Sequence, residues 1–172
     1  AETAYRIATQ TTYPSWGYML QNGATTLWER WEYATGDEMN SHNHPMMGSI
    51  DSWFYTYLLG IVPDAEHPGF DRFTIHPSVV DDLEFAEGEF NSVKGMIRSG
   101  GSKKNGVLSL NVTIPANSVA TVYVPSSRVG SITESGKNAA KAPSVRFLGE
   151  QDGCGVFEVG SGDYRFRSTL KK

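Results

Sequence analysis

Val107-Leu-Ser-Leu-Asn-Val-Thr-Ile114 alternates apolar and polar side chains from Leu108 onward. This alternation is typical of a β-strand that buries one face in a core and exposes the other. Pro115-Ala-Asn117 follows as a turn signal, and residues 119–124 form a second strand candidate that ends at Pro125. The stretch therefore predicts two consecutive strands joined by a turn.

Further strand candidates lie on both sides of this pair, and Gly and Ser clusters such as Ser99-Gly-Gly-Ser102 separate them. These candidates are residues 93–98, 144–148, 155–159 and 164–169. Short strands at such spacing predict an antiparallel β-sandwich of roughly 100 residues.

Toward the N-terminus the pattern changes to that of helices. Residues 48–59 carry apolar side chains at the spacing of one helix face, and Gly60 is a natural stop. Residues 4–11 predict another helix, and residues 25–31 predict a turn or a short helix. The predicted fold class is α+β. A short N-terminal helical segment, residues 1–62, is followed by the antiparallel β-sandwich, residues 63–172.

The helical part is rich in aromatic rings and in acidic residues. It holds eleven of the twenty aromatic rings, among them all four tryptophans, and residues 1–60 carry the whole net charge of −4. Such a mixture suits a carbohydrate site and also a large aromatic core. Two or three helices cannot bury so many rings among themselves. They therefore either dock on the sandwich or are the last piece of a larger helical domain, and the pattern favours the second interpretation.

The composition excludes several classes of protein. The net charge of −4 argues against a nucleic-acid binder, which needs a basic face. No apolar run approaches eighteen residues, so no membrane span is expected. The single cysteine, Cys154, excludes an internal disulfide and a zinc–cysteine site. The first ten residues resemble no signal peptide, and the compartment stays undetermined.

Glu29 is the candidate catalytic residue. It lies between Trp28 and Trp31 and directly before Arg30. A carboxylate beside indole rings can act as a general base that activates water for attack on an anomeric carbon. A buried glutamate that pairs with Arg30 or with backbone amides explains the same pattern, so the residues alone leave both hypotheses open.

His42 and His44 stand two apart in a segment rich in Asn and Ser. Metal ligands on one strand face can have this spacing, but no third ligand is evident, so no metal is expected. We expect one histidine to donate a hydrogen bond to a polar ligand and the other to be structural or exposed.

Three motifs in the first 44 residues together resemble a known enzyme family. They are Tyr13-Pro-Ser-Trp-Gly-Tyr-Met-Leu20, Gly23-Ala-Thr-Thr-Leu-Trp-Glu-Arg-Trp-Glu32 and Met39-Asn-Ser-His-Asn-His44. Weaker support comes from Gly48-Ser-Ile-Asp-Ser-Trp-Phe54, Ile75-His-Pro77 and Ile114-Pro-Ala-Asn-Ser118. The chain resembles the C-terminal portion of the α-L-rhamnosidases of glycoside hydrolase family 78.

The resemblance implies a fold and a set of site residues. Residues 1–62 would be the last helices of an (α/α)6 catalytic barrel, and the rest would be the C-terminal β-sandwich. Glu29 matches the general base of an inverting mechanism, and His44 matches a histidine that contacts rhamnose. Trp28 and Trp31 match wall or support residues of the site. The family usually has a bulky apolar residue where this chain has His42, and it uses no cofactor.

The resemblance also implies what this chain lacks. The general acid of the family lies well upstream, and nothing in these 172 residues matches it. We therefore expect a full-length enzyme that removes terminal α-L-rhamnose from glycosides or polysaccharides, and an isolated chain that is inactive. The barrel-facing side of the 48–59 helix would be uncovered in the isolated chain, which predicts self-association through that face.

Two alternatives to an enzyme fragment stay open. The sandwich could be a non-catalytic carbohydrate-binding module that uses Tyr123, Phe147, Phe157 or Tyr164, although their strand positions favour a place in the core. It could instead be a structural module that caps and stabilises the helical domain, which is the role that we favour for the sandwich.

Overall fold

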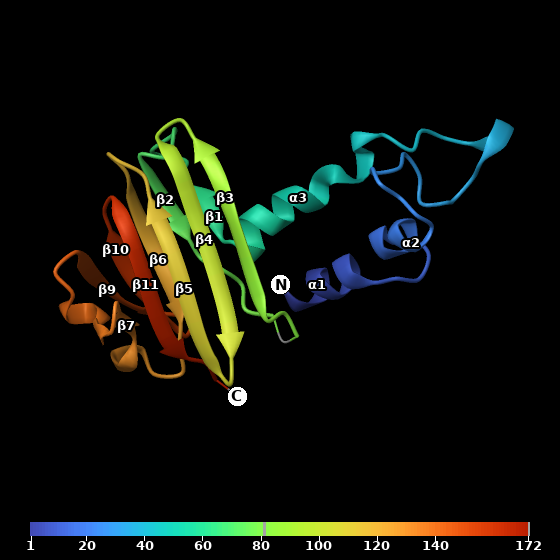
Figure 1. Cartoon of the computed structure of the whole chain (residues 1–172). Helices are drawn as coiled ribbons and strands as arrows, with labels where there is room; N and C mark the ends of the chain where they lie inside the picture. The colour runs from blue at the N-terminus through green and yellow to red at the C-terminus, as the bar shows by residue number, and fades with distance from the viewer. Residues whose placement is uncertain (81, 172) are drawn as a thin grey trace. The chain divides into compact units, whose positions relative to one another are not determined.

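The computed structural model describes residues 1–80 and 82–171, and the chain divides into two compact units (Figure 1). The first unit, Ala1–Phe54, contains short helices and irregular segments, and the second, Tyr55–Lys172, contains β-strands. The predicted α+β class, with a short helical part before a sandwich of largely antiparallel sheets, is confirmed. The domain boundary at residue 62 stays a prediction.

The helices of the first unit are short. They are α1 (Glu2–Thr9), α2 (Trp16–Gln21), η1 (Gly36–Glu38), η2 (Pro45–Ser49) and α3 (Ile50–Trp53). The α2 helix begins where the side chain of Ser15 accepts a hydrogen bond from the backbone N–H of Tyr18 at 2.9 Å, a typical N-cap. None of these helices, nor any other helix in residues 1–80 and 82–171, is long and apolar enough to span a membrane.

The helix predicted over residues 48–59 forms as a helical run of changing pitch. It begins as the 3₁₀-helix η2, continues as α3 and ends as the π-helix η3 (Phe54–Leu58). Gly60 ends the run with a φ of +70°. A Cβ at this position would lie 2.1 Å from the carbonyl carbon of His76, so the turn accepts only glycine.

Residues 25–31 form no helix, contrary to one of the two predicted options. They form bends and extended backbone instead. The reason is tertiary, because Leu27 and Glu29 exchange backbone hydrogen bonds with residues 41–44 rather than with their own neighbours.

Within the described residues, the strands of the second unit form two sheets. The five-stranded sheet consists, in spatial order, of β1 (Ile61–Pro63), β2 (Arg72–Ile75), β6 (Val119–Pro125), β10 (Cys154–Val159) and β9 (Val145–Gln151). The six-stranded sheet consists of β3 (Phe85–Ser92), β4 (Gly95–Lys104), β5 (Val107–Ile114), β11 (Gly162–Thr169), β7 (Thr133–Glu134) and β8 (Lys137–Asn138). Paired strands are antiparallel except for β2 and β6, which are parallel.

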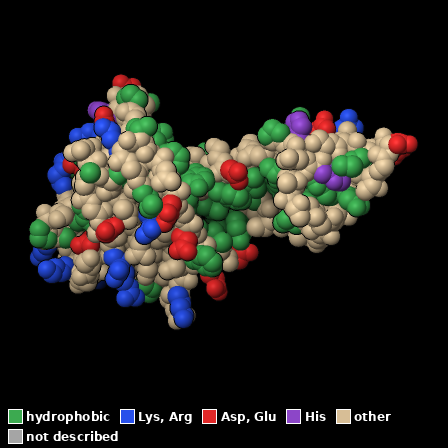
Figure 2. All heavy atoms as spheres, turned by 45° about the horizontal axis from the view of Figure 1, so that its top comes forward, with side chains coloured by type: hydrophobic (Ala, Val, Ile, Leu, Met, Phe, Trp, Pro, Cys, Tyr) green, Lys and Arg blue, Asp and Glu red, His purple; other side chains and the backbone are tan. Residues whose placement is uncertain are grey.

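The core of the second unit lies between the inner faces of these sheets. The alternation of β5 is realised as predicted, because the four apolar residues of its inner face are buried and its polar residues point outward. Phe157 of β10 stacks on Phe166 of β11, with ring centroids 5.5 Å apart, and so joins the two sheets. Lys, Arg, Asp and Glu side chains are interspersed over the visible face of this unit (Figure 2).

Five of these strands, β1, β2, β3, β7 and β8, were not predicted, and Ser99-Gly-Gly-Ser102 is not a separator between strands. These four residues lie inside β4, where they pair with β3 on one side and β5 on the other. A Cβ on Gly100 would lie 3.2 Å from the Cβ of Glu87 in β3, so glycine allows close cross-strand packing at this point.

Candidate functional site

Two segments of the helical unit lie side by side and carry the predicted site residues. The backbone N–H of Glu29 donates to the carbonyl of Ser41 at 2.8 Å, and that of His44 donates to the carbonyl of Leu27 at 2.9 Å. The hydroxyl of Thr26 also donates to the carbonyl of His42. These bonds bring residues 26–29 and 41–44 together, so that Glu29 and His44 stand on neighbouring segments.

The carboxylate of Glu29 is held by the facing segment. Its Oε2 atom accepts a hydrogen bond from the backbone N–H of Ser41 at 3.2 Å. The residue is half-buried, and Arg30 pairs with Glu32 at 3.9 Å instead. Glu29 is thus neither sealed in a core nor neutralised by the adjacent guanidinium. A partly exposed carboxylate with one oxygen fixed by a backbone donor has the freedom at its other oxygen that a general base needs.

The imidazole of His44 is fixed by the helix that it begins. His44 is the N-cap of η2, and its Nδ1 atom accepts a hydrogen bond from the backbone N–H of Met46 at 3.1 Å. Because a backbone N–H can only donate, Nδ1 carries no proton in this arrangement. The proton of the neutral ring is then on Nε2, which is a donor suited to a hydroxyl or carbonyl oxygen.

The two tryptophans predicted at the site occupy different environments. Trp28 is 2% exposed, and its ring stacks against those of His42 and Tyr33, with centroids 4.6 and 5.4 Å away. Trp31 is half-buried and meets Trp16 edge-on, with centroids 5.1 Å apart. Trp28 is therefore enclosed by other rings, whereas Trp31 keeps part of its surface accessible.

The ring of His42 lines a hollow beside Trp28. This hollow has a volume of about 220 Å³ and is lined by Trp28, Tyr33, His42, Met39 and small residues, most of them from the 22–26 segment. Neither Glu29 nor His44 lines it. Residue spacing left the role of His42 open, and the only sequence signal for the stack was the density of aromatic residues around it.

A second hollow of the helical unit, of about 380 Å³, is largely apolar. It is lined by Trp16, Met19, Leu20, Leu27 and Phe54, among others. No group of three or more His, Cys, Asp or Glu residues that could hold a metal ion occurs in residues 1–80 and 82–171.

The sandwich unit carries a shallow polar hollow of about 1060 Å³ on the outer face of the six-stranded sheet. Glu87, Glu89, Arg98, Asn111, Asp163 and Arg165 are among its lining residues. Two cross-strand pairs hold part of this lining in place. Arg98 donates to Glu89, with Nε 2.9 Å from Oε1, and the hydroxyl of Thr113 lies 2.6 Å from Oδ1 of Asp163.

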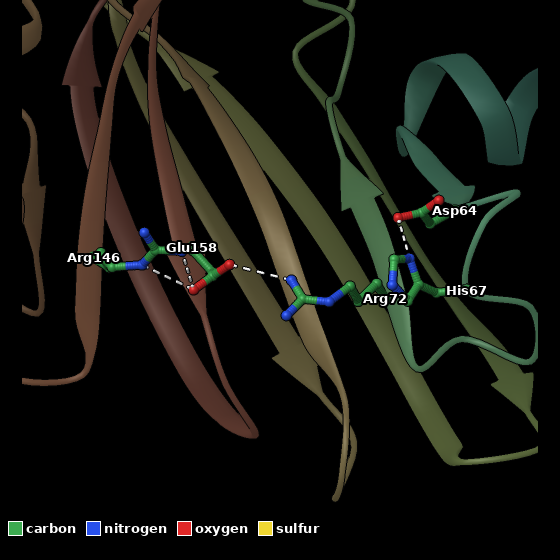
Figure 3. A network of polar contacts seen from close by, with 5 residues as sticks. All are labelled: Asp64, His67, Arg72, Arg146 and Glu158. Atoms are coloured by element: carbon green, nitrogen blue, oxygen red, sulfur yellow. Dashed lines mark hydrogen bonds and ion pairs between the residues drawn. The ribbon is translucent and has the colours of Figure 1, made fainter.

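Charged residues of the sandwich form polar contacts on the five-stranded sheet and its loop (Figure 3). Glu158 accepts hydrogen bonds from Arg146 at 2.7 Å and from Arg72 at 3.3 Å, and chiefly the Arg146 bond lowers the pKa of its carboxyl. In the loop after β1, a backbone bond from Glu66 and then the ring of His67 lower the pKa of Asp64. These groups tie strands and a loop of the sandwich together.

Comparison with known protein families gives two adjoining matches. A model described as the bacterial alpha-L-rhamnosidase 6 hairpin glycosidase domain matches residues 1–58. A model described as the bacterial alpha-L-rhamnosidase C-terminal domain matches residues 60–139.

Curated proteins and solved structures agree with these matches. An alpha-L-rhamnosidase of Streptomyces avermitilis is 34% identical over 171 residues, which are 96% of this chain and 16% of that protein. One from Alteromonas sp. is 33% identical over 92% of this chain and 17% of its own length.

The crystal structure of Streptomyces avermitilis alpha-L-rhamnosidase complexed with L-rhamnose aligns with a TM-score of 0.84 and 33% identity, over 96% of this chain and 16% of that one. The α-L-rhamnosidase from Dictyoglumus thermophilum also aligns with a TM-score of 0.84 and 39% identity, over 99% of this chain and 19% of that one. The chain thus spans less than a fifth of each of these relatives.

Proposed function

Because the chain belongs to the bacterial α-L-rhamnosidases, a family of glycoside hydrolases, we propose that it forms part of an enzyme that removes terminal α-L-rhamnose from glycosides or polysaccharides. The observation that carries the proposal is the pairing of residues 26–29 with residues 41–44. This pairing sets a half-exposed carboxylate and a tautomer-fixed imidazole on neighbouring segments of the part that matches the glycosidase domain.

In this proposal Glu29 is the general base of an inverting hydrolysis. The backbone N–H of Ser41 holds one oxygen of its carboxylate, and the other oxygen removes a proton from the attacking water. An inverting enzyme needs its acid and base roughly 6.5–9.5 Å apart, with room for that water. The acid would come from a part of the six-hairpin domain outside these 172 residues.

His44 would bind the sugar rather than transfer protons. Its Nε2–H would donate to a rhamnose hydroxyl, because Nδ1 is already engaged by Met46. Trp28 would support the segment that carries Glu29. Trp31, which keeps part of its surface accessible, would form part of the wall of the sugar-binding site.

The direct test is Glu29→Gln in the intact enzyme. The amide keeps the size of the side chain but cannot accept the proton of water, so we expect turnover of an aryl rhamnoside to be abolished while the fold is kept. Glu32→Gln is the matched control, because Glu32 lies in the same motif, is exposed and pairs only loosely with Arg30. If Glu29→Gln retained most of the activity, Glu29 would not be the base.

The isolated chain tests whether the general acid must come from outside these 172 residues. We expect the 172-residue chain to release no rhamnose from a nitrophenyl rhamnoside, because a base without an acid cannot complete the displacement. Detectable release above that of the Glu29→Gln chain would show that this piece is catalytically complete and would contradict the proposal.

The polar hollow on the six-stranded sheet favours one second candidate, a glycan-binding sandwich. We prefer a structural role, because Phe157 and Tyr164 are buried in the core, and Phe147, which is 42% exposed, does not line this hollow. Rhamnose titrations distinguish the two. All four tryptophans lie in the first 53 residues, so a fluorescence change reports on the helical site. Binding seen by calorimetry without that change would favour the sandwich.

A further inference from the structure

Three rings in the helical unit are stacked nearly parallel. The imidazole of His42 lies 4.6 Å from Trp28 at an interplanar angle of 18°, and Tyr33 lies 5.4 Å from Trp28 at 29°. The centroids of Tyr33 and His42 are 6.0 Å apart at 22°. Trp28, the residue directly before Glu29, is almost completely buried by this arrangement.

His42 also occupies the centre of the segment that faces Glu29. The residue before it, Ser41, binds Glu29 twice, through its carbonyl at 2.8 Å and through its N–H to the carboxylate at 3.2 Å. The carbonyl of His42 itself accepts a bond from Thr26, and His44 follows two residues later. Its ring therefore contacts Trp28 and its carbonyl contacts Thr26, both in the facing segment.

We propose that His42 is a positioning residue, whose ring holds Trp28 and thereby sets Glu29 and His44 in register. This inference rests on the proposed function of Glu29 and His44. The hydrogen bonds between the two segments join their backbones and leave the indole of Trp28 free to tilt. A planar ring packed face to face on Trp28 removes that freedom, because the indole cannot tilt without losing the stack.

The hollow beside the stack explains why the ring is needed. About 220 Å³ of space adjoins Trp28, Tyr33 and His42, and its walls include small side chains such as Gly23, Ala24 and Thr25. These small residues cannot replace a ring, so truncation of His42 would widen the hollow and let Trp28 move. A displacement of about 1 Å at a catalytic group can cost on the order of 100-fold in rate.

The test compares His42→Ala with His42→Phe in the intact enzyme. The alanine variant is expected to lose roughly 10- to 100-fold in kcat/KM, with the larger part in kcat, because the base is displaced. The phenylalanine variant keeps a planar ring and is expected to retain most of the activity. His67→Ala is the control, because that histidine lies in a loop of the sandwich, paired with Asp64.

Three results would overturn the proposal. They are a kcat/KM of His42→Ala close to that of the wild type, a kcat/KM of His42→Phe as low as that of His42→Ala, and a loss in His42→Ala that comes from a raised KM with kcat unchanged. Glu29→Gln assayed in parallel separates the two hypotheses. If that variant stays active, the proposed base is wrong. If it is inactive while His42→Ala is active, only the positioning role is wrong.

A second measurement covers the case in which the alanine variant of the enzyme does not fold. Hydrogen exchange of the Glu29 and His44 amides can be followed in the 172-residue chain, where both bond across the two segments. We expect faster exchange in His42→Ala and unchanged exchange in His42→Phe. If the two amides exchanged at the same rate in His42→Ala and in His42→Phe, the ring would not hold the segments, and the proposal would be overturned.

Discussion

The sandwich buries its own core, whereas the helical unit does not. In the sandwich, residues from both sheets, such as Ile75, Leu110, Val122 and Phe166, are completely buried. Among the described residues of the helical unit, only two apolar side chains, Met19 and Trp28, are buried, while Leu20 is 70% exposed. The sandwich therefore has the means to fold by itself, and the helical unit exposes surfaces that a larger domain would cover.

This difference places chemistry and stability in separate parts of the chain. The candidate catalytic and sugar-binding residues lie in the helical unit, which buries few apolar side chains. Backbone hydrogen bonds and stacked rings hold these residues in place. The sandwich, which buries many apolar side chains, contributes ion pairs and a polar face. Substitutions should therefore divide into those that unfold the sandwich and those that alter the site without much effect on stability.

The largest effect is expected in the sandwich core. Phe166→Ala removes a completely buried ring that stacks on Phe157, and the cavity should cost about 3–5 kcal/mol of unfolding free energy. Phe85→Ala is the control, because Phe85 is 64% exposed and should change little. Urea denaturation of the 172-residue chain measures both. Similar losses in the two variants would mean that the core is not the source of stability.

The next effect concerns the uncovered surface of the helical unit. We expect the isolated chain to self-associate, because Phe54 and its apolar neighbours line an open hollow. Phe54→Glu should weaken the association seen by light scattering, and Phe85→Glu in the sandwich should not. A clean monomer of the unsubstituted chain at high concentration would show that this surface does not drive association.

The smallest effect is expected from the ion-pair network of the sandwich. The hydrogen bonds from Arg146, and then from Arg72, lower the pKa of Glu158 below its ordinary value of 4.5. A carboxyl whose pKa is lower in the folded state stabilises the fold above the unfolded pKa, and the contribution is lost as the pH falls through the folded pKa. Unfolding free energies above and below pH 4.5 should differ less in Glu158→Gln than in the parent. An unchanged pH dependence would mean that the network contributes nothing.

Local pattern was enough to predict much of the sandwich. The strict alternation of residues 108–114 corresponds to β5, because one face of that strand is buried and the other is solvated. The strand that contains Gly100 and Gly101 was misjudged, since its hydrogen bonds to β3 and β5 outweigh the flexibility that glycine gives to an isolated chain.

The site could be predicted only as a set of residues. Motif resemblance pointed to Glu29 and His44, and this assignment stays a prediction. No pattern in residues 25–31 could indicate that their backbone pairs with residues 41–44, because the partner lies twelve or more residues away. The His42–Trp28 stack was missed for the same reason.

The amino-acid sequence by itself determined the class of the fold, the membership of the family and the residues on which the proposed chemistry depends, because these follow from local periodicity and from motifs. Only the tertiary structure decided which of these residues face one another. The stacking of Trp28 with His42 and the bond from Ser41 to Glu29 arise from contacts between separate segments. Such contacts depend on how the chain packs, and residue spacing alone does not record them.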